Sequence, residues 1–153
     1  PNYPGKLRSH TMMVSDGNMY IHGGQKNVGQ NSSTTYVYYL QVDSGAPFRQ
    51  ERDTSIGFAL GGPLSAMHAR VWWICGRLGT PQQSIYSLDL RTEKWSVFYS
   101  PQKAEAAPAL RSCSGLTSFE GSVWLFGGTD GVKTLNDFWK FDLESKQWTK
   151  LES

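Results

Sequence analysis

Histidine is the commonest metal ligand in proteins, and the chain has three histidines, His10, His22 and His68. If the chain turns at Asp16-Gly17, the resulting antiparallel pair places His22 opposite Thr11, with His10 one position further along its strand. Successive strand residues point to opposite faces, so His10 and His22 lie on opposite faces and cannot share a metal. His68 is expected near a turn. We therefore predict no metal site.

No segment has the spacing of a catalytic motif. The sequence contains no glycine-rich phosphate loop, no nucleophile elbow and no zinc-protease pairing of histidine and glutamate. Cys75 and Cys113 are too far apart for a zinc knuckle, and we expect both to be buried free thiols. We predict no catalytic residue and no cofactor, and therefore a protein that is not an enzyme.

Charge and composition narrow the class of partner and of fold. The 15 lysines and arginines are scattered along the chain and leave a formal net charge of +2, so we expect no nucleic-acid partner. No apolar run is long enough to cross a membrane, and we expect no membrane partner. With 16 glycines and 13% aromatic residues, the 153-residue chain is typical of short strands joined by tight turns, which predicts an all-β domain.

A repeat runs along the chain. Three apolar segments end in the pairs Gly23-Gly24, Cys75-Gly76 and Gly127-Gly128, whose second residues, at 24, 76 and 128, are 52 positions apart. Downstream, residues 84–95 overlay residues 137–148 without a gap. Each period has room for four strands separated by turn residues, and a period near 50 is typical of propeller blades.

These glycine pairs, followed downstream by an aromatic residue and a tryptophan as in Phe141 and Trp148, resemble the kelch repeat. The resemblance covers nearly the whole chain, with repeats at about 7–51, 58–99 and 110–153. It implies a kelch-type β-propeller in which this chain forms three four-stranded antiparallel blades, with six blades expected in the complete ring. The glycine and tryptophan positions are interpreted as structural.

The resemblance also implies a partner-binding face. In each repeat the loop between the second and third strands, such as residues 25–34, is polar and emerges on the same side. The lead-in pairs Arg8-Ser9 and Arg111-Ser112 match those of kelch blades, in which such residues contact the partner. Arg77 is added from its loop position alone. The alternative for each arginine is a solvated charge or a salt bridge between blades.

Two hypotheses for the function stay open at this point. The first is a cytoplasmic protein-interaction module that binds a protein or peptide partner, acidic in charge, through its loop face. The alternative is part of a secreted propeller, either a galactose-oxidase-like copper enzyme or an ectodomain adhesion module, and the glycosylation sequon Asn31-Ser32-Ser33 fits that location. Three blades leave two open faces, which we expect further blades of the same polypeptide to cover rather than a second copy.

Overall fold

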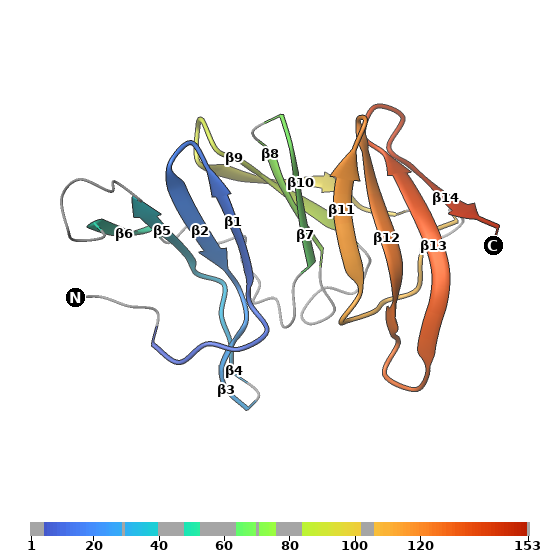
Figure 1. Ribbon diagram of the computed structural model, residues 1–153, viewed down its shortest axis with the longest axis horizontal. Helices are drawn as coiled ribbons and strands as arrows, with labels where there is room; N and C mark the ends of the chain where they lie inside the picture. The colour runs from blue at the N-terminus through green and yellow to red at the C-terminus, as the bar shows by residue number, and fades with distance from the viewer. Residues whose placement is uncertain are drawn as a thin grey trace.

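The computed structural model describes residues 5–28, 30–39, 48–52, 64–69, 71–75, 84–101 and 106–152. All regular structure within these ranges is β-strand, as expected from the composition. Three four-stranded antiparallel sheets follow one another along the chain, and a two-stranded hairpin projects from the first (Figure 1). No helix in these ranges is long and apolar enough to span a membrane.

Each four-stranded sheet takes its strands in chain order from one edge to the other. The first sheet contains β1 (Thr11–Ser15), β2 (Asn18–His22), β5 (Thr35–Tyr39) and β6 (Phe48–Arg52), and the projecting hairpin contains β3 (Gln25–Asn27) and β4 (Gln30–Asn31). The second sheet contains β7 (Leu64–His68), β8 (Val71–Cys75), β9 (Ile85–Asp89) and β10 (Lys94–Tyr99). The third sheet contains β11 (Gly115–Phe119), β12 (Ser122–Thr129), β13 (Thr134–Asp142) and β14 (Gln147–Leu151).

Tight turns join the first two strands of the first and third sheets. Asp16 and Gly17 have φ angles of 49° and 73°, and the equivalent Glu120-Gly121 turn has φ angles of 45° and 67°. Left-handed conformations at both central positions match the twist of an antiparallel pair, which explains the glycine in each turn. The turn at Asp16 pairs Thr11 with His22, as predicted, and His22 is buried.

A second turn type links the last two strands of the second and third sheets. Oδ1 of Asp89 accepts hydrogen bonds from the backbone amides of Arg91 at 2.8 Å and Thr92 at 3.2 Å. Oδ1 of Asp142 accepts two in the same way, at 3.1 and 2.8 Å. These hydrogen bonds lower the pKa of both carboxyl groups. The gapless overlay of residues 84–95 on 137–148 therefore reflects one shared turn.

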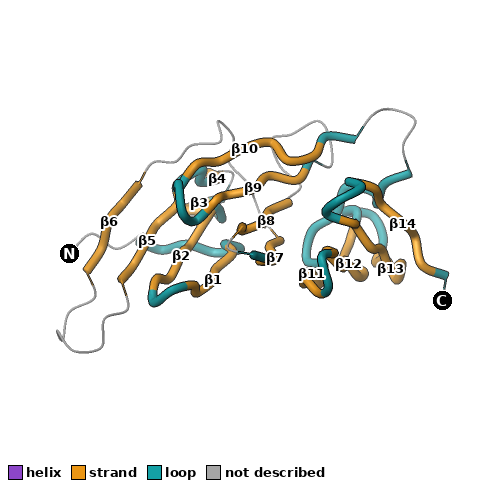
Figure 2. Tube along the Cα trace, turned by 90° about the horizontal axis from the view of Figure 1, so that it is seen from above, coloured by secondary structure: helices purple, strands orange, loops and turns teal. Residues whose placement is uncertain are grey.

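The three sheets are arranged as a fan. Their first strands lie towards the inner side and their last strands towards the outside (Figure 2), and β7 contacts both β1 and β11. This is how neighbouring blades of a β-propeller are arranged.

Apolar clusters fill the wedges between neighbouring sheets. Tyr20 and Val37 of the first sheet pack with Leu88 of the second, and Trp95 lies against this cluster. A larger cluster joins the second and third sheets and contains Ala66, Ile85, Tyr99, Val123, Leu125, Trp139, Phe141 and Trp148. Burial of aromatic and aliphatic area at both wedges holds the fan together. Trp148 belongs to this core, as the repeat analysis predicted.

Candidate functional site

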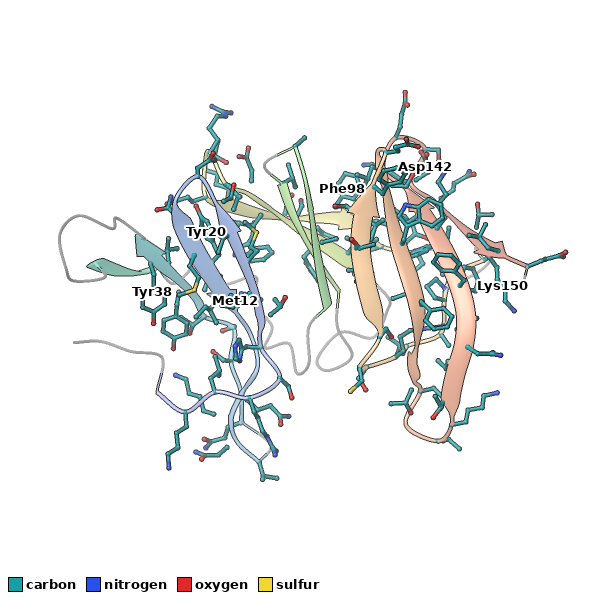
Figure 3. All side chains as sticks on the ribbon, in the orientation of Figure 1. Met12, Tyr20, Tyr38, Phe98, Asp142 and Lys150 are labelled. Carbon is teal, nitrogen blue, oxygen red and sulfur yellow. The ribbon has the colours of Figure 1, made fainter. Side chains whose placement is uncertain are left out.

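Two loops project from the same end of the molecule. The β3–β4 hairpin extends from the first sheet, and residues 130–133 connect β12 and β13 of the third (Figure 1). Each carries an exposed apolar residue at its tip. Val28 is 87% exposed and Val132 is 94% exposed. The hairpin turns at Asp16-Gly17 and Glu120-Gly121 lie at the opposite end, as does Asp142 (Figure 3). We call the end with Val28 and Val132 the loop end.

At the loop end a lead-in segment crosses beside each glycine doublet. In the first sheet Arg8 and Gln25 exchange two backbone hydrogen bonds of 3.1 and 2.8 Å. In the third sheet Ser112 and Thr129 exchange the equivalent pair, at 3.0 and 2.9 Å. A Cβ atom added to Gly128 would lie 2.6 Å from the Ser112 carbonyl oxygen. The second residue of these doublets is therefore glycine because the lead-in backbone passes too close for a side chain.

This backbone register corrects the alignment of the Arg-Ser pairs by one residue. The bridges make Arg8 equivalent to Ser112, so the position of Arg111 is occupied in the first sheet by Leu7. Ser9 is then equivalent to Cys113, and both have left-handed backbones, with φ of 53° and 58°. An Arg-Ser pair in the sequence does not determine the alignment of the two lead-ins to within one residue. The backbone bridge to the residue after each glycine doublet does.

Arg111 is buried, with only 5% of its surface exposed, and its donors are engaged within its own repeat. Its Nη1 and Nη2 atoms bind the two carboxylate oxygens of Asp137 at 2.5 and 2.8 Å. Nη1 also donates to the Gly127 carbonyl at 3.0 Å, and Nε donates to the Ala109 carbonyl at 3.0 Å. The arginine thus ties the lead-in of the third sheet to β13 and to the glycine doublet.

The acid of this pair is held in its charged form. Hydrogen bonds from the Arg111 guanidinium hold the pKa of Asp137 well below its usual value. The Trp139 indole adds a third bond, from Nε1 to Oδ2 at 2.6 Å. A bidentate arginine–carboxylate pair of this kind is among the stronger polar contacts in proteins. Its geometry gives Arg111 a structural role, and partner contact by this residue stays a prediction.

Arg8 has a different environment. It is exposed, and its Nε donates to Oε1 of Gln25 at 3.2 Å. Lys6 and Lys26 are also exposed. Within the part of the chain that the structure describes, none of these three cations forms an ion pair. The loop end of the first sheet therefore presents positive charge that no carboxylate among the described residues pairs with.

The other predicted site residues fall into two groups. Ser9 and Ser112 lie at the loop end, Ser9 exposed and Ser112 half-buried beside Thr129. Arg77 lies outside the described residues. The structure thus brings Arg8 and Ser9 together on the first sheet and Arg111 and Ser112 on the third, and their role in partner binding stays a prediction.

Several loop-end residues escaped the sequence analysis. Asp137 lies 26 positions after Arg111, and no local motif links them. Val28 and Val132 are single valines in polar loops, and their shared position emerges only when the glycine doublets are superposed. Cys113 was expected to be buried and is exposed; it follows the Ser112–Thr129 bridge and has a left-handed backbone.

His22 is the one strongly perturbed histidine among the described residues. Burial lowers its pKa to about 4. Its Nδ1 lies 2.9 Å from Oγ1 of Thr35, and its ring centroid lies 4.8 Å from that of Trp95 in the second sheet. The histidine therefore belongs to the wedge between the first two sheets. Among the described residues no group of three or more histidine, cysteine, aspartate or glutamate side chains could hold a metal.

Comparison with known proteins gives consistent matches. The profile of the family described as "KLHDC2/KLHL20/DRC7 Kelch-repeats domain" matches residues 9–153. Kelch domain-containing protein 10 of Xenopus tropicalis is 25% identical to the chain, and that of Rattus norvegicus is 32% identical; each alignment covers 97% of this chain and 37% of the relative. Kelch-like protein 40 of Xenopus laevis is 25% identical, over 95% of this chain and 24% of its own length. The chain spans little more than a third of the first two relatives.

Proposed function

This chain belongs to the kelch-repeat family, and from that membership we propose that it is a protein–protein interaction module that binds its partner through the loop end. Domains of this family generally mediate protein–protein interactions, and the kelch profile matches nearly the whole chain. The single observation that carries the choice of surface is the pair of equivalent loops that expose Val28 and Val132 at the same end.

Hydrogen bonds join the described residues within each loop, which lowers the conformational entropy that these residues lose on binding. In the third sheet, Oδ1 of Asp130 accepts from the amides of Val132 at 2.8 Å and Lys133 at 2.9 Å. In the first, Nδ2 of Asn27 donates to Oε1 of Gln30 at 2.9 Å. Preformed loops on a rigid β scaffold are a common way to present a binding surface.

Site-specific photo-cross-linking tests the surface directly. A photoreactive amino acid replaces Val28 or Val132 at the loop end, and matched control variants carry it at the exposed Glu120 or Glu144 of the opposite end. We expect a discrete cross-linked protein from the loop-end variants and none from the controls. Cross-links of the same protein from the control positions alone would place the binding surface elsewhere.

A further inference from the structure

The positive charge at the loop end is not distributed evenly between the two described loops. Among residues 5–34 the only carboxylate is that of Asp16, and it lies in the turn at the opposite end. In the third sheet Lys133 shares its loop with Asp130, and Arg111 is paired with Asp137. The first sheet therefore provides the only net positive part of the loop end that the structure describes.

Three cations form this part: Lys6, Arg8 and Lys26, which we call the basic cluster. Leu7 lies between the first two and packs against the apolar cluster of Ile21, Tyr36 and Tyr38. Its inward side chain directs Lys6 and Arg8 outwards, consistent with their exposure. Lys26 follows Gln25, whose backbone is bonded to Arg8, so all three cations lie on adjoining segments.

The backbone under the basic cluster is fixed before any ligand arrives. Two backbone bonds join Arg8 to Gln25, and the amide of Ser32 donates to the Gly24 carbonyl at 2.8 Å. The bond from Arg8 Nε to Gln25 orients the guanidinium and leaves its two terminal nitrogens for a carboxylate, which such a fork binds in bidentate fashion. Val28 then offers an apolar contact at the hairpin tip.

We propose that the basic cluster, with Val28, binds an acidic peptide segment that carries an apolar side chain beside its carboxylates. This inference rests on the proposed function and names the chemistry of the partner. Three cations are few for a nucleic-acid backbone, whose binding proteins typically neutralise about six or more phosphates. Apart from His10, residues 5–10 and 23–34, which carry the cluster, contain no aromatic side chain on which a base could stack.

Fluorescence anisotropy with synthetic peptides tests the proposal. The probe is a fluorescein-labelled peptide in which glutamates flank a pair of leucines, and its partner probe has glutamine in place of each glutamate. The test variant is Lys6→Gln/Arg8→Gln/Lys26→Gln. The matched control, Arg91→Gln/Lys94→Gln/Lys150→Gln, removes the same charge from exposed positions outside the cluster and outside the two projecting loops.

We expect the glutamate peptide to bind, with an affinity that falls as salt is added, and the glutamine peptide to bind much more weakly. The test variant should weaken binding about tenfold, as expected when three exposed charge pairs are lost, and the control less than twofold. Val28→Ser should weaken binding about twofold to threefold. Circular dichroism should show the same fold in all variants.

Three results would overturn the inference: no binding of the glutamate peptide, equal losses in the test and control variants, or tighter binding of a single-stranded oligonucleotide through the same three cations. Cross-linking from Val28 and Val132 reports partner contact whatever the partner's charge. Persisting loop-end cross-links with no peptide binding would therefore refute the acidic ligand alone, whereas their absence would refute the proposed function.

Discussion

The loop ends of the first and third sheets have the same backbone arrangement but different side chains. Both contain a lead-in bridge to the residue after a glycine doublet, a left-handed residue next to it, and an exposed valine at the loop tip. In the third sheet a buried arginine fastens the lead-in to Asp137. In the first sheet Leu7 fills the arginine's place, and the neighbouring Arg8 is left exposed.

The difference shows how a repeat separates folding from binding. The glycine doublet sets the backbone in both sheets, because nothing larger fits beside the lead-in. The residue before the bridge differs between the two sheets. An arginine at this position, Arg111, is buried and paired with Asp137, whereas Leu7 at this position packs inwards and Arg8 beside it is exposed. A lead-in arginine in the sequence is therefore not evidence for binding until its register is known.

The largest expected effect tests the shared backbone. Gly24→Ala and Gly128→Ala should each destabilise the fold by about 3 kcal/mol or more. The added Cβ atom would clash with a lead-in carbonyl oxygen, and alanine would also be strained in the left-handed backbone conformation of these positions. The closest carbonyl oxygens are those of Arg8 at 2.7 Å and Ser112 at 2.6 Å. Gly121→Ala, with open space around it, should cost only about 1 kcal/mol. Urea unfolding measures all three, and a cost at Gly128 no larger than at Gly121 would contradict the shared constraint.

The next effect separates the two arginines. Arg111→Leu leaves the Asp137 carboxylate without its main partner and should destabilise the fold by about 3 kcal/mol. Arg8→Leu removes an exposed contact to Gln25 and should change stability by less than about 0.5 kcal/mol. Urea unfolding monitored by tryptophan fluorescence compares them. Equal costs for the two variants would mean that the lead-ins have the same role.

Lowering the pH should reduce the stability of the fold through His22 and through Asp137, in different pH ranges. The folded-state pKa of His22 is about 4, below its ordinary 6.5, so the unfolded chain binds a proton there that the folded chain does not. Stability should therefore fall as the pH drops from 6.5 to 4, by at most about 3 kcal/mol. Asp137, whose pKa is lowered, contributes stability that is lost only below its ordinary pKa of 3.8.

Unfolding midpoints across this range separate the two groups. His22→Gln should flatten the dependence above pH 4, and Asp137→Asn should leave the slope there intact while lowering stability at every higher pH. An unchanged slope in His22→Gln would show that another group controls the upper window.

Sequence reasoning reached the repeat, the all-β class and the strand pairings because local signals encode them. The Asp16-Gly17 turn alone fixed which residues face each other in the first hairpin, and Trp148 followed from the repeat spacing. The Arg111–Asp137 pair was out of reach, because it depends on two chain segments meeting across a blade. The exposure of Arg8 was equally hidden, since one position of register separates a buried arginine from an exposed one.

The smallest effect on stability concerns the outer faces of the same two sheets. On the third sheet Phe119 and Phe126 are 61% and 56% exposed, and with Trp124 and Phe138 they line a hollow of about 560 Å³. On the first sheet the outward face, which by repeat register is the opposite side of the blade, buries Tyr36 and Tyr38 and exposes Met12 and Val14. The third sheet therefore offers the larger free apolar surface.

Repeat equivalence indicates what this surface is for. By strand register Phe138 stands where Ile85 stands in the second sheet, and Ile85 is buried in the wedge against the third sheet. The face around Phe138 is thus equivalent to a face that the neighbouring sheet covers in the second repeat, and where nothing covers it the chain should self-associate. Phe119→Gln/Phe126→Gln should reduce association and binding of a hydrophobic dye, with a stability change below about 1 kcal/mol because both rings are already exposed. Met12→Gln/Val14→Gln, which changes similarly exposed residues on the outward face of the first sheet, should reduce association less. Light scattering compares the variants. If the unchanged chain is already a monodisperse monomer that binds no hydrophobic dye, the apolar face around Phe138 does not drive association.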